Sequence, residues 1–358
     1  MLSRAVAVLA GDGIGSEVTR AAVKVLGRVR SDLEYVSCQV GASALASGQS
    51  ALPAETRAVC ERSGAILFGA VGLPQYEGLP LEERPEYALY LLRRDFRLFA
   101  NIRPVRVFPG LERSSSLLPE LVRGLDLVVV RELTGGVYFG TPKETRTIDG
   151  IETAVDTMVY RAPEIERIAR VGFELARRRR KTLTSVDKQN ILETSRLWRR
   201  IVNAVAQAYP DVTVDHLLVD NAAMQLVRAP KSFDVLLTEN LFGDILSDEA
   251  AMLTGSIGNL PSASLGAGGS PGRQFGLYEP IGGSAPDIAG KGIANPVAAI
   301  LSAALLLRHS FDDESNAFQM EEAVAKAIAD GARTHDIARS GEQALDTQAF
   351  TQCVLANL

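Results

Sequence analysis

Several charged and hydroxyl side chains in this sequence directly follow strand-like apolar segments. An arginine and a tyrosine follow VVV in VVVRELTGGVY, a lysine follows TSVD, and aspartates end HLLVD and recur in LLTENLFGDILSDE. In open α/β sheets, ligands bind beyond the carboxyl ends of the strands. The candidate functional residues are therefore Arg131, Tyr138, Lys188, Asp220, Asp244 and Asp248.

Three of these candidates are carboxylates that could hold a metal ion. Asp244 and Asp248 are four positions apart, so a helix would place both on one face, where like charges repel unless a cation lies between them. With Asp220 they form an all-oxygen set without His or Cys, which favours Mg²⁺ or Mn²⁺. The competing interpretation is that Asp244 and Asp248 line a solvated helix face.

An arginine-rich segment, YLLRRDFRLFANIRPVR, could bind a substrate. Arg103 follows the apolar run LFANI, and Arg93 lies ten residues before it. Guanidinium groups bind carboxylates through two parallel hydrogen bonds. Two or three arginines near a divalent cation would suit a small polycarboxylate.

The composition limits the available chemistry. Only three histidines, His216, His309 and His335, occur in 358 residues, so acid–base catalysis would rely on lysine, tyrosine and carboxylates. The net charge of −5 gives no global argument for nucleic-acid binding. The basic run ARRRRK, residues 176–181, is expected to end a helix and lie in water, where it complements the helix dipole.

The cysteines and the apolar runs predict a cytoplasmic protein without a membrane partner. Cys38, Cys60 and Cys353 are odd in number and widely spaced, which suggests neither a disulfide framework nor a zinc site and fits a reducing compartment. The N-terminal residues read as a first strand followed by a turn, not as a signal peptide. No run approaches the roughly 18 apolar residues of a membrane helix.

Strand-like and helix-like segments alternate along the chain. The expected strands cover residues 4–10, 33–40, 65–71, 125–133, 182–187, 212–220 and 234–240. Amphipathic helices are expected over residues 16–29, 162–179 and 191–209. This alternation predicts an α/β fold with a largely parallel sheet, and the length predicts two domains.

Two long segments break this alternation. Residues 136–163 are polar, turn-rich and too long for a simple connection, which predicts an arm or β-hairpin that serves a homodimer. Residues 258–296 are dense in Gly, Pro and Ser, and are read as an irregular region that could be a plain loop or a ligand-binding surface.

The glycine-rich stretch LAGDGIGSEV looks like a dinucleotide-binding turn but fails its spacing. Its glycines are Gly11, Gly13 and Gly15, and Ser16 stands where the last glycine of the Rossmann fingerprint belongs. We expect a strand-to-helix turn, because the segment follows an apolar run and precedes a helical pattern, with Ser16 capping the helix. This segment does not predict a true Rossmann fold.

Four longer segments resemble one enzyme family. RELTGGVYFG, VDKQNILETSRLWR, NLFGDILSDEAAMLTGSIGNLPSASLG and EPIGGSAPDIAGKGIANP are similar to signature segments of the 3-isopropylmalate dehydrogenases, which belong to the β-decarboxylating hydroxyacid dehydrogenases. The resemblance extends from GDGIG to about Arg308. It implies the two-domain fold of that family and NAD-dependent oxidative decarboxylation of 3-isopropylmalate in leucine biosynthesis.

The resemblance assigns roles to the candidate residues. It implies that the arginines bind substrate carboxylates, the aspartates bind Mg²⁺ or Mn²⁺, Asp220 also contacts substrate, and a tyrosine and a lysine act in catalysis. The arginines are Arg93, Arg103 and Arg131, the metal-binding aspartates are Asp220, Asp244 and Asp248, and the catalytic pair is Tyr138 and Lys188. In this family Lys188 and Asp220 would come from the partner subunit of a homodimer. A cofactor-binding domain would comprise residues 1–99 and 252–358, and a substrate, metal and dimerisation domain residues 100–251.

The implied reaction needs no histidine. The cation would bind the C2 hydroxyl and the C1 carboxylate of the substrate and lower the pKa of the hydroxyl. Lys188 would take the hydroxyl proton, C2 would pass a hydride to the nicotinamide, and the β-carboxylate would leave as CO₂. Tyr138 would protonate the carbon.

The resemblance places NAD on the loop GGSAPDIAGKGIANP. Asp287 would accept hydrogen bonds from the ribose hydroxyls and repel a 2′-phosphate, which selects NAD over NADP, while Ile288 and Asn295 would contact the adenine. The other implied cofactor-binding residues are Ile14, Glu86, Gly283, Ser284, Ala285 and Pro286.

The sequence departs from the family pattern where the side group of the substrate would bind. Leu89 keeps a leucine that the family places against the isopropyl group, and Ile191 is an acceptable apolar partner, but Tyr90 replaces a second leucine. A phenol is larger and brings a hydroxyl that needs a partner, so it either rotates away or the pocket accepts a different malate. The alternatives are the same chemistry on homoisocitrate, tartrate or a related acid, and a non-catalytic binding protein on this fold.

Overall fold

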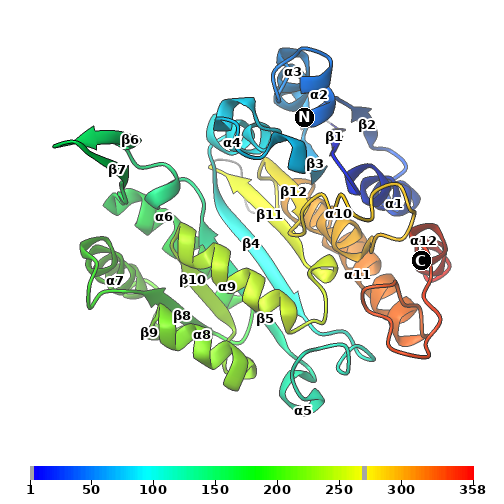
Figure 1. The fold of residues 1–358 in the computed structure, drawn as a ribbon. Coiled ribbons are helices and arrows are strands. Elements are labelled where there is room, and N and C mark those ends of the chain that lie inside the picture. Colours follow the sequence, from blue (N-terminus) through cyan, green and yellow to red (C-terminus); the bar gives the residue numbers. More distant parts are fainter. Residues whose placement is uncertain (1–3, 268–271) are drawn as a thin grey trace. The chain divides into compact units, whose positions relative to one another are not determined.

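In the computed structural model, which describes residues 4–267 and 272–358, the chain divides into two units (Figure 1). Unit 1 comprises Met1–Leu98, Arg106–Gly124 and Ala251–Leu358, and unit 2 comprises Phe99–Val105 and Leu125–Ala250. The sequence-based division assigned all of residues 100–251 to one domain, whereas residues 106–124 group with unit 1 in the structure. The order of elements along the chain does not reveal this, because residues 106–124 return to unit 1 before the chain enters unit 2 again.

Unit 1 contains a five-stranded stretch of sheet in the order β2-β1-β3-β12-β11. Its strands are β1 (Ala5–Gly11), β2 (Glu34–Ser37), β3 (Ala65–Ala70), β11 (Pro261–Gly266) and β12 (Gly276–Pro280). Its helices are α1 (Gly15–Val29), α2 (Ala42–Ala46), α3 (Ala54–Arg62), α4 (Tyr87–Asp95), α5 (Pro119–Val122), α10 (Val297–Ser310), α11 (Glu314–Ala329) and α12 (Thr347–Leu355). The pairs β1–β2, β1–β3 and β12–β3 are parallel.

Unit 2 continues this architecture with strands in the order β4-β5-β10-β8-β9. The strands are β4 (Leu98–Arg106), β5 (Asp126–Glu132), β8 (Thr182–Asp187), β9 (Thr213–Leu218) and β10 (Val235–Thr238), and the helices are α6 (Ala162–Arg177), α7 (Glu193–Ala206), α8 (Val219–Arg228) and α9 (Asn240–Met252). The pairs β10–β5, β10–β8 and β8–β9 are parallel. The predicted α/β class with a mostly parallel sheet is confirmed, as is the helix that carries Asp244 and Asp248.

The Gly- and Pro-rich region 258–296 is more ordered than its composition indicated. Its strands β11 and β12 pair antiparallel and are almost entirely buried, and residues 268–271 lie outside the described part. Small side chains allow α10 to pack on these strands, and the hydroxyls find partners: Tyr278 Oη lies 2.7 Å from Ser310 Oγ. The reading of the whole region as irregular was wrong, because the burial of these strands depends on a helix that follows later in the chain.

The polar excursion between β5 and α6 contains the expected hairpin. Strands β6 (Lys143–Ile148) and β7 (Ile151–Asp156) pair antiparallel and project from unit 2 (Figure 1). Asp149 and Gly150, both at positive φ, form the tight turn. Ile151 at its tip is 68% exposed, so the hairpin exposes apolar side chains to solvent in this chain.

The basic run after α6 only partly follows the expectation that it lies in water. Arg178 and Arg180 are exposed, but Arg179 donates from Nε to Asp234 Oδ1 at 2.7 Å and from Nη2 to Asp126 Oδ1 at 2.8 Å. The Asp234 side chain is only 1% exposed. Arg180 also contacts this carboxylate, from its main-chain N at 2.9 Å, so part of the run stabilises a buried acid and does not only lie in water.

Among the described residues, no helix is long and apolar enough to cross a bilayer. All three cysteines, Cys38, Cys60 and Cys353, are free thiols.

Candidate functional site

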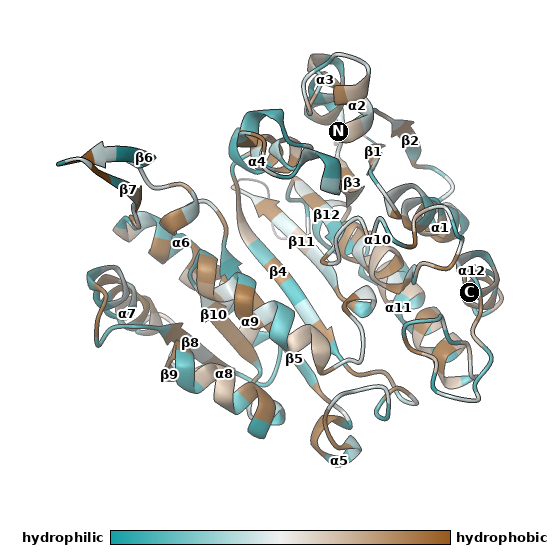
Figure 2. Cartoon of the chain, viewed as in Figure 1, coloured by the Kyte–Doolittle hydropathy of each residue, from teal (hydrophilic) through white to brown (hydrophobic). Residues whose placement is uncertain are grey.

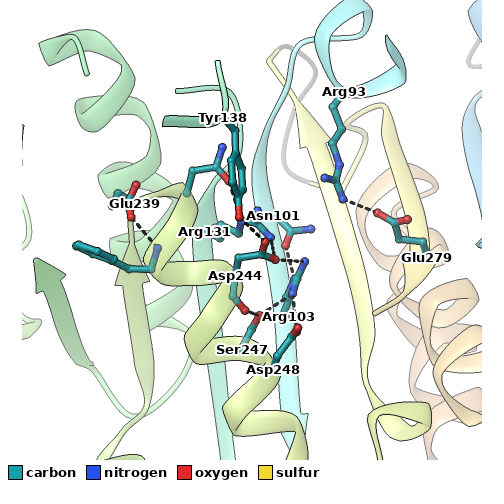
Figure 3. Close-up of polar contacts among 12 residues, drawn as sticks. Arg93, Asn101, Arg103, Arg131, Tyr138, Glu239, Asp244, Ser247, Asp248 and Glu279 are labelled. Atoms are coloured by element: carbon teal, nitrogen blue, oxygen red, sulfur yellow. Dashed lines mark hydrogen bonds and ion pairs between the residues drawn. The ribbon is translucent and has the colours of Figure 1, made fainter. Parts of the chain in front are cut away.

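Five of the candidate residues meet in unit 2, where β4, β5 and α9 lie together (Figure 3). Arg103 comes from β4, Arg131 from the end of β5, and Tyr138 from the short 3₁₀ turn Gly136–Tyr138. Asp244 and Asp248 come from α9. We call this group the arginine–aspartate cluster.

Arg131 and Tyr138 both contact Asp244. Arg131 Nη1 forms an ion pair with Asp244 Oδ1, and Tyr138 Oη donates to Asp244 Oδ2 at 2.9 Å. The guanidinium of Arg131 lies 5.8 Å from the centroid of the Tyr138 ring. Arg131 is only 2% exposed whereas Tyr138 is 37% exposed, so the phenol is accessible while the cation behind it is buried.

Arg103 contacts the same helix from the neighbouring strand. Its Nη1 donates to Ser247 Oγ at 2.6 Å and lies 3.4 Å from Asp248 Oδ1, and its Nη2 lies 3.7 Å from Asp244 Oδ1. Asp244, Ser247 and Asp248 share one face of α9 because positions i, i+3 and i+4 of a helix are neighbours. Two buried arginines thus face two carboxylates that remain partly exposed.

The charges in this cluster shift the pKa values of its acids. Burial alone would raise the pKa of Asp244, but Arg131 and Arg103 outweigh it and lower that pKa. Burial, with the like charge of Asp244, raises the pKa of Asp248 although Arg103 opposes this. Burial and the Asp244 charge also raise the pKa of Tyr138. The tyrosine is therefore held as a neutral phenol that can donate a proton.

Glycines allow this close approach. A Cβ on Gly243 would lie 2.3 Å from Thr238 Oγ1 and 2.7 Å from Arg131 Cγ, so only glycine lets α9 start directly against Arg131. Gly136, at φ +77°, would bring a Cβ to 2.7 Å from Tyr160 Oη. The glycine of the motif FGD is thus required by packing around the arginine.

The second predicted catalytic group is separate in this chain. Lys188, which follows β8, donates to Asp220 Oδ1 at 2.6 Å, and this hydrogen bond lowers the pKa of Asp220. The Asp220 side chain is 59% exposed. Within the described ranges, no three His, Cys, Asp or Glu side chains converge to hold a metal ion. The chain by itself therefore presents Asp244 and Asp248 in one place and Asp220 in another.

Arg93 lies on α4 in unit 1. Its Nη2 donates to Glu279 Oε1 at 3.1 Å, whereas its Nε is buried without a partner (Figure 3). The Tyr90 ring stacks on Tyr87 at 5.7 Å between centroids, and the Arg94 guanidinium lies 5.8 Å from the Tyr90 centroid. The aromatic ring thus has neighbours on its own helix, while Leu89 packs partly against the core of unit 1.

The proposed cofactor loop contacts the GDGIG turn within unit 1. Ile14 N donates to Ser284 O at 2.8 Å, and Ser284 Oγ donates to Gly72 O. A Cβ on Gly13 would lie 1.9 Å from Ser284 O. The adjoining main chain therefore requires glycine at position 13. Helix α1 begins at Gly15 with Ile14 as its N-cap, so the expectation that Ser16 caps it was wrong.

Other predicted cofactor residues lie on or near this loop. Asp287 is exposed, Ala285 has φ +41°, and a Cβ on Gly283 would meet no atom within 4 Å. Asn295 Nδ2 donates to Asn259 Oδ1 and Asp336 Oδ2, each at 2.9 Å. Glu86 occupies the N-cap position of α4 without a capping hydrogen bond from its side chain, and that side chain lies against Gly72. Ile288 and Pro286 belong to the same loop.

Sequence reasoning missed the residues that support these side chains. Asn101 accepts a hydrogen bond from Arg103 Nε at 2.7 Å, and Asn240 accepts one from Arg131 Nε at 2.9 Å. In unit 1, Asp12 accepts from Ala42 N and Gly72 N, and burial raises its pKa. A polar residue within an apolar strand, as Asn101 is in LFANIRPV, was the available signal.

Comparisons with known proteins show the family of this chain. The family model described as isocitrate/isopropylmalate dehydrogenase matches residues 5–354. A 3-isopropylmalate dehydrogenase from Bordetella avium is 53% identical over 362 residues, which covers 100% of both chains. One from Bacillus subtilis is 52% identical over 360 residues, which covers 99% of this chain and 97% of the relative.

Solved structures give the same result. An isocitrate dehydrogenase from Methylococcus capsulatus is 34% identical with a TM-score of 0.86 and covers 100% of this chain and 99% of its own. The apo form of a β-decarboxylating dehydrogenase from Thermococcus kodakarensis is 35% identical with a TM-score of 0.79, covering 100% and 96%. The chain belongs to the isocitrate/isopropylmalate dehydrogenase family.

Proposed function

We propose that this chain is an NAD-dependent 3-isopropylmalate dehydrogenase that converts (2R,3S)-3-isopropylmalate to 4-methyl-2-oxopentanoate and CO₂ in leucine biosynthesis. The names of relatives that share about half of its residues over their whole length support this substrate. The observation that carries the proposal is the arginine–aspartate cluster with the accessible phenol of Tyr138. Such a cluster suits an acidic substrate beside a cation.

The arginines are the proposed carboxylate ligands. Arg103 and Arg131 are buried and held at fixed positions by β4, β5 and α9. A guanidinium that is already oriented loses little freedom when a carboxylate binds. Arg93 is proposed as a further carboxylate ligand from unit 1, supported by its buried Nε that has no partner.

The carboxylates fit a hard divalent cation. Asp244 and Asp248 supply oxygen ligands only, with no soft sulfur or imidazole in the cluster, which suits Mg²⁺ or Mn²⁺. We propose that Asp220 from a partner subunit completes the set and contacts the substrate. A bound cation would lower the pKa of the substrate hydroxyl and stabilise the charge that develops as CO₂ leaves, while NAD accepts the hydride.

Two side chains are proposed to move protons. Lys188, held by Asp220 at 2.6 Å, would accept the proton of the C2 hydroxyl from a substrate in the partner's cluster. Tyr138 would donate its proton to the carbon that has lost CO₂. Its raised pKa supports this role, because the phenol stays protonated until a carbanion-like acceptor forms.

Unit 1 is the proposed cofactor-binding part and unit 2 the substrate, metal and dimerisation part. The loop from Gly283 to Ile288 is proposed to hold the adenosine, with Asp287 on the ribose hydroxyls. Asp287 is exposed, and its carboxylate would repel a 2′-phosphate. Ile288 and Asn295 are proposed to contact the adenine, and Ile14 and Glu86 other parts of NAD.

The apolar side group would meet Leu89 and Ile191, and Tyr90 lies at the remaining position proposed to face it. Ile191 is 69% exposed, which suits a residue that is covered by ligand or partner. The stacking of Tyr90 on Tyr87 supports the alternative in which the phenol turns away from the side group. The same chemistry on homoisocitrate, tartrate or another 3-substituted malate is the second candidate function.

A homodimer with shared sites is proposed from exposed apolar surface in unit 2. Met224 and Val227 on α8 are 60% and 49% exposed, and Ile245 on α9 is 58% exposed. Figure 2 shows hydrophobic residues on both helices. Exposed apolar residues on adjoining elements are typical of a subunit interface. Together with the hairpin arm, which we place within residues 136–163, they support a second copy as the partner.

The substrate assignment is tested by initial rates of NADH production with a panel of 3-substituted malates, with Mg²⁺ or Mn²⁺ present or chelated. We expect 3-isopropylmalate to give the highest kcat/KM and chelation to abolish turnover. Faster turnover of homoisocitrate or tartrate would replace the substrate. No turnover of any acid would favour the non-catalytic alternative.

The shared site is tested by mixing two inactive variants, Lys188→Ala and Asp244→Ala. A mixed dimer would combine one intact lysine with one intact cluster, so random exchange should restore about one quarter of wild-type activity, because half of the dimers are mixed and each holds one intact site of two. A site contained in one chain would give no recovery.

The cytoplasm is the proposed location, since the free thiols fit a reducing compartment.

A further inference from the structure

Two buried asparagines hold the two arginines of the cluster in the same way. Asn101 Oδ1 accepts from Arg103 Nε at 2.7 Å, and Asn240 Oδ1 accepts from Arg131 Nε at 2.9 Å. Both asparagines are fully buried, at 0% exposure. They come from different elements, β4 and the first residue of α9, so the repeated contact is not a consequence of one local motif.

Each contact fixes the plane of a guanidinium. Nε is the nitrogen through which the planar group joins its flexible stem, so a hydrogen bond at Nε sets the direction of both terminal nitrogens. Asn101 and Arg103 are two positions apart in a strand and therefore share one face of the sheet. The sequence pattern N-x-R in β4 thus builds the orientation into the strand itself.

The neutrality of these acceptors has a consequence for binding. A carboxylate at 2.7 Å from Nε would orient the guanidinium equally well, but it would cancel the charge that attracts an anionic substrate. An amide oxygen orients the group and leaves its charge in place. Asp244 and Asp248 already offset the arginines, and in the proposed function they are occupied by a cation.

Asn240 also connects Arg131 to the turn that carries Tyr138. Its Nδ2 donates to Gly135 O at 3.0 Å, and its main-chain N donates to Tyr160 Oη at 2.9 Å. Tyr160 in turn packs against Gly135 and Gly136. One side chain therefore links the substrate-facing arginine to the proposed proton donor.

We propose that Asn101 and Asn240 are positioning residues that set recognition of the substrate carboxylates by orienting Arg103 and Arg131 through uncharged acceptors, with Asn240 also fixing the Tyr138 turn. This inference rests on the proposed function, because it assumes that the arginines bind the substrate. It makes the chemical identity of the acceptor, amide or carboxylate, a determinant of substrate affinity.

The test replaces each amide by the carboxylate of the same shape. In Asn101→Asp, KM for 3-isopropylmalate should rise at least ten-fold, while kcat, KM for NAD and the melting temperature change little, because the new charge pairs with Arg103. In Asn240→Asp, an oxygen would replace the group that donates to Gly135 O. Its kcat should therefore fall together with the rise in substrate KM. Asn203→Asp, an exposed change on α7, is the matched control.

A purely structural role predicts a different pattern. It would make Asn101→Ala, which removes the acceptor from a buried arginine, worse in both melting temperature and KM than the isosteric Asn101→Asp. If Asn101→Ala is worse than Asn101→Asp in both measurements, the inference is overturned while the proposed function stands. The same holds if the wild type is active and the substrate KM of Asn101→Asp is unchanged.

A direct binding measurement distinguishes a failure of the proposed function from a failure of this inference. If the wild type turns over no malate, the proposed function fails, and isothermal titration with D-malate and Mg²⁺ then decides the inference. Binding by the wild type that weakens at least ten-fold in Asn101→Asp would support it. Equal binding by both proteins, or none by either, would overturn it.

Discussion

Replacement of Gly13 by alanine should disturb both stability and NAD binding. Gly13 has φ +57°, and a Cβ there would lie 1.9 Å from Ser284 O, well inside the 3.0 Å that real Cβ contacts respect. The left-handed backbone costs an L-residue about 1–2 kcal/mol, and displacement of packed main chain adds about 1–3 kcal/mol. The total is about 2–5 kcal/mol, and the displaced segment is the proposed adenosine loop.

Gly48 provides the matched control. It has φ +77° in the same unit, but a Cβ there would meet no atom within 4 Å. Gly48→Ala should therefore show only the backbone cost of about 1–2 kcal/mol. At roughly 2–4 °C per kcal/mol, its melting temperature should fall by a few degrees, and that of Gly13→Ala by clearly more.

The assay combines thermal unfolding with NAD kinetics. KM for NAD should rise at least ten-fold in Gly13→Ala and stay within about two-fold of the wild type in Gly48→Ala, as expected when only one change moves a binding loop. If the two variants lose equal stability, the close approach to Ser284 is wrong. If Gly13→Ala is less stable but binds NAD normally, the loop does not hold the cofactor.

Three further predictions concern a buried ion pair, the proton donor and cofactor choice. Asp234→Asn should lower the free energy of unfolding by about 3–5 kcal/mol, since it removes the buried charged partner of Arg179. The measurement is urea unfolding followed by the fluorescence of the single tryptophan. Asp211→Asn, at an exposed ion pair, should lower it by under about 1 kcal/mol, and equal losses in the two variants would contradict the burial argument. Tyr138→Phe should slow release of the finished product more than hydride transfer in single-turnover experiments; equal slowing of both would remove the proton-donor role. Asp287→Lys combined with Ile288→Tyr should raise kcat/KM for NADP relative to NAD, and an unchanged ratio would refute the adenosine placement.

The elements of the fold could be predicted where their signal is local. The alternation of apolar and amphipathic segments located β5, β8, β10 and α6 closely, because periodicity depends only on neighbours in the chain. The same signal failed for β11 and β12. The segment PSASLG of β11 is rich in small residues and GLYEP of β12 is short, so neither shows a strand-like pattern. Both become buried strands by packing with α10.

The sequence by itself determined the chemical composition of the candidate site. It identified carboxylates four positions apart on a helix, arginines near strand ends, and a chemistry that does not depend on histidine. The spacing of Asp244 and Asp248 fixed their common helix face, since the period of an α-helix is a local property.

Only the tertiary structure decided which of these groups meet. It brought Arg103, Arg131, Tyr138 and Asp244 together, left Asp220 with Lys188, and set the GDGIG turn against Ser284. It also introduced the asparagines that orient the arginines. Contacts of this kind join segments far apart in the chain, so they depend on how strands and helices pack, which no local pattern of residues contains.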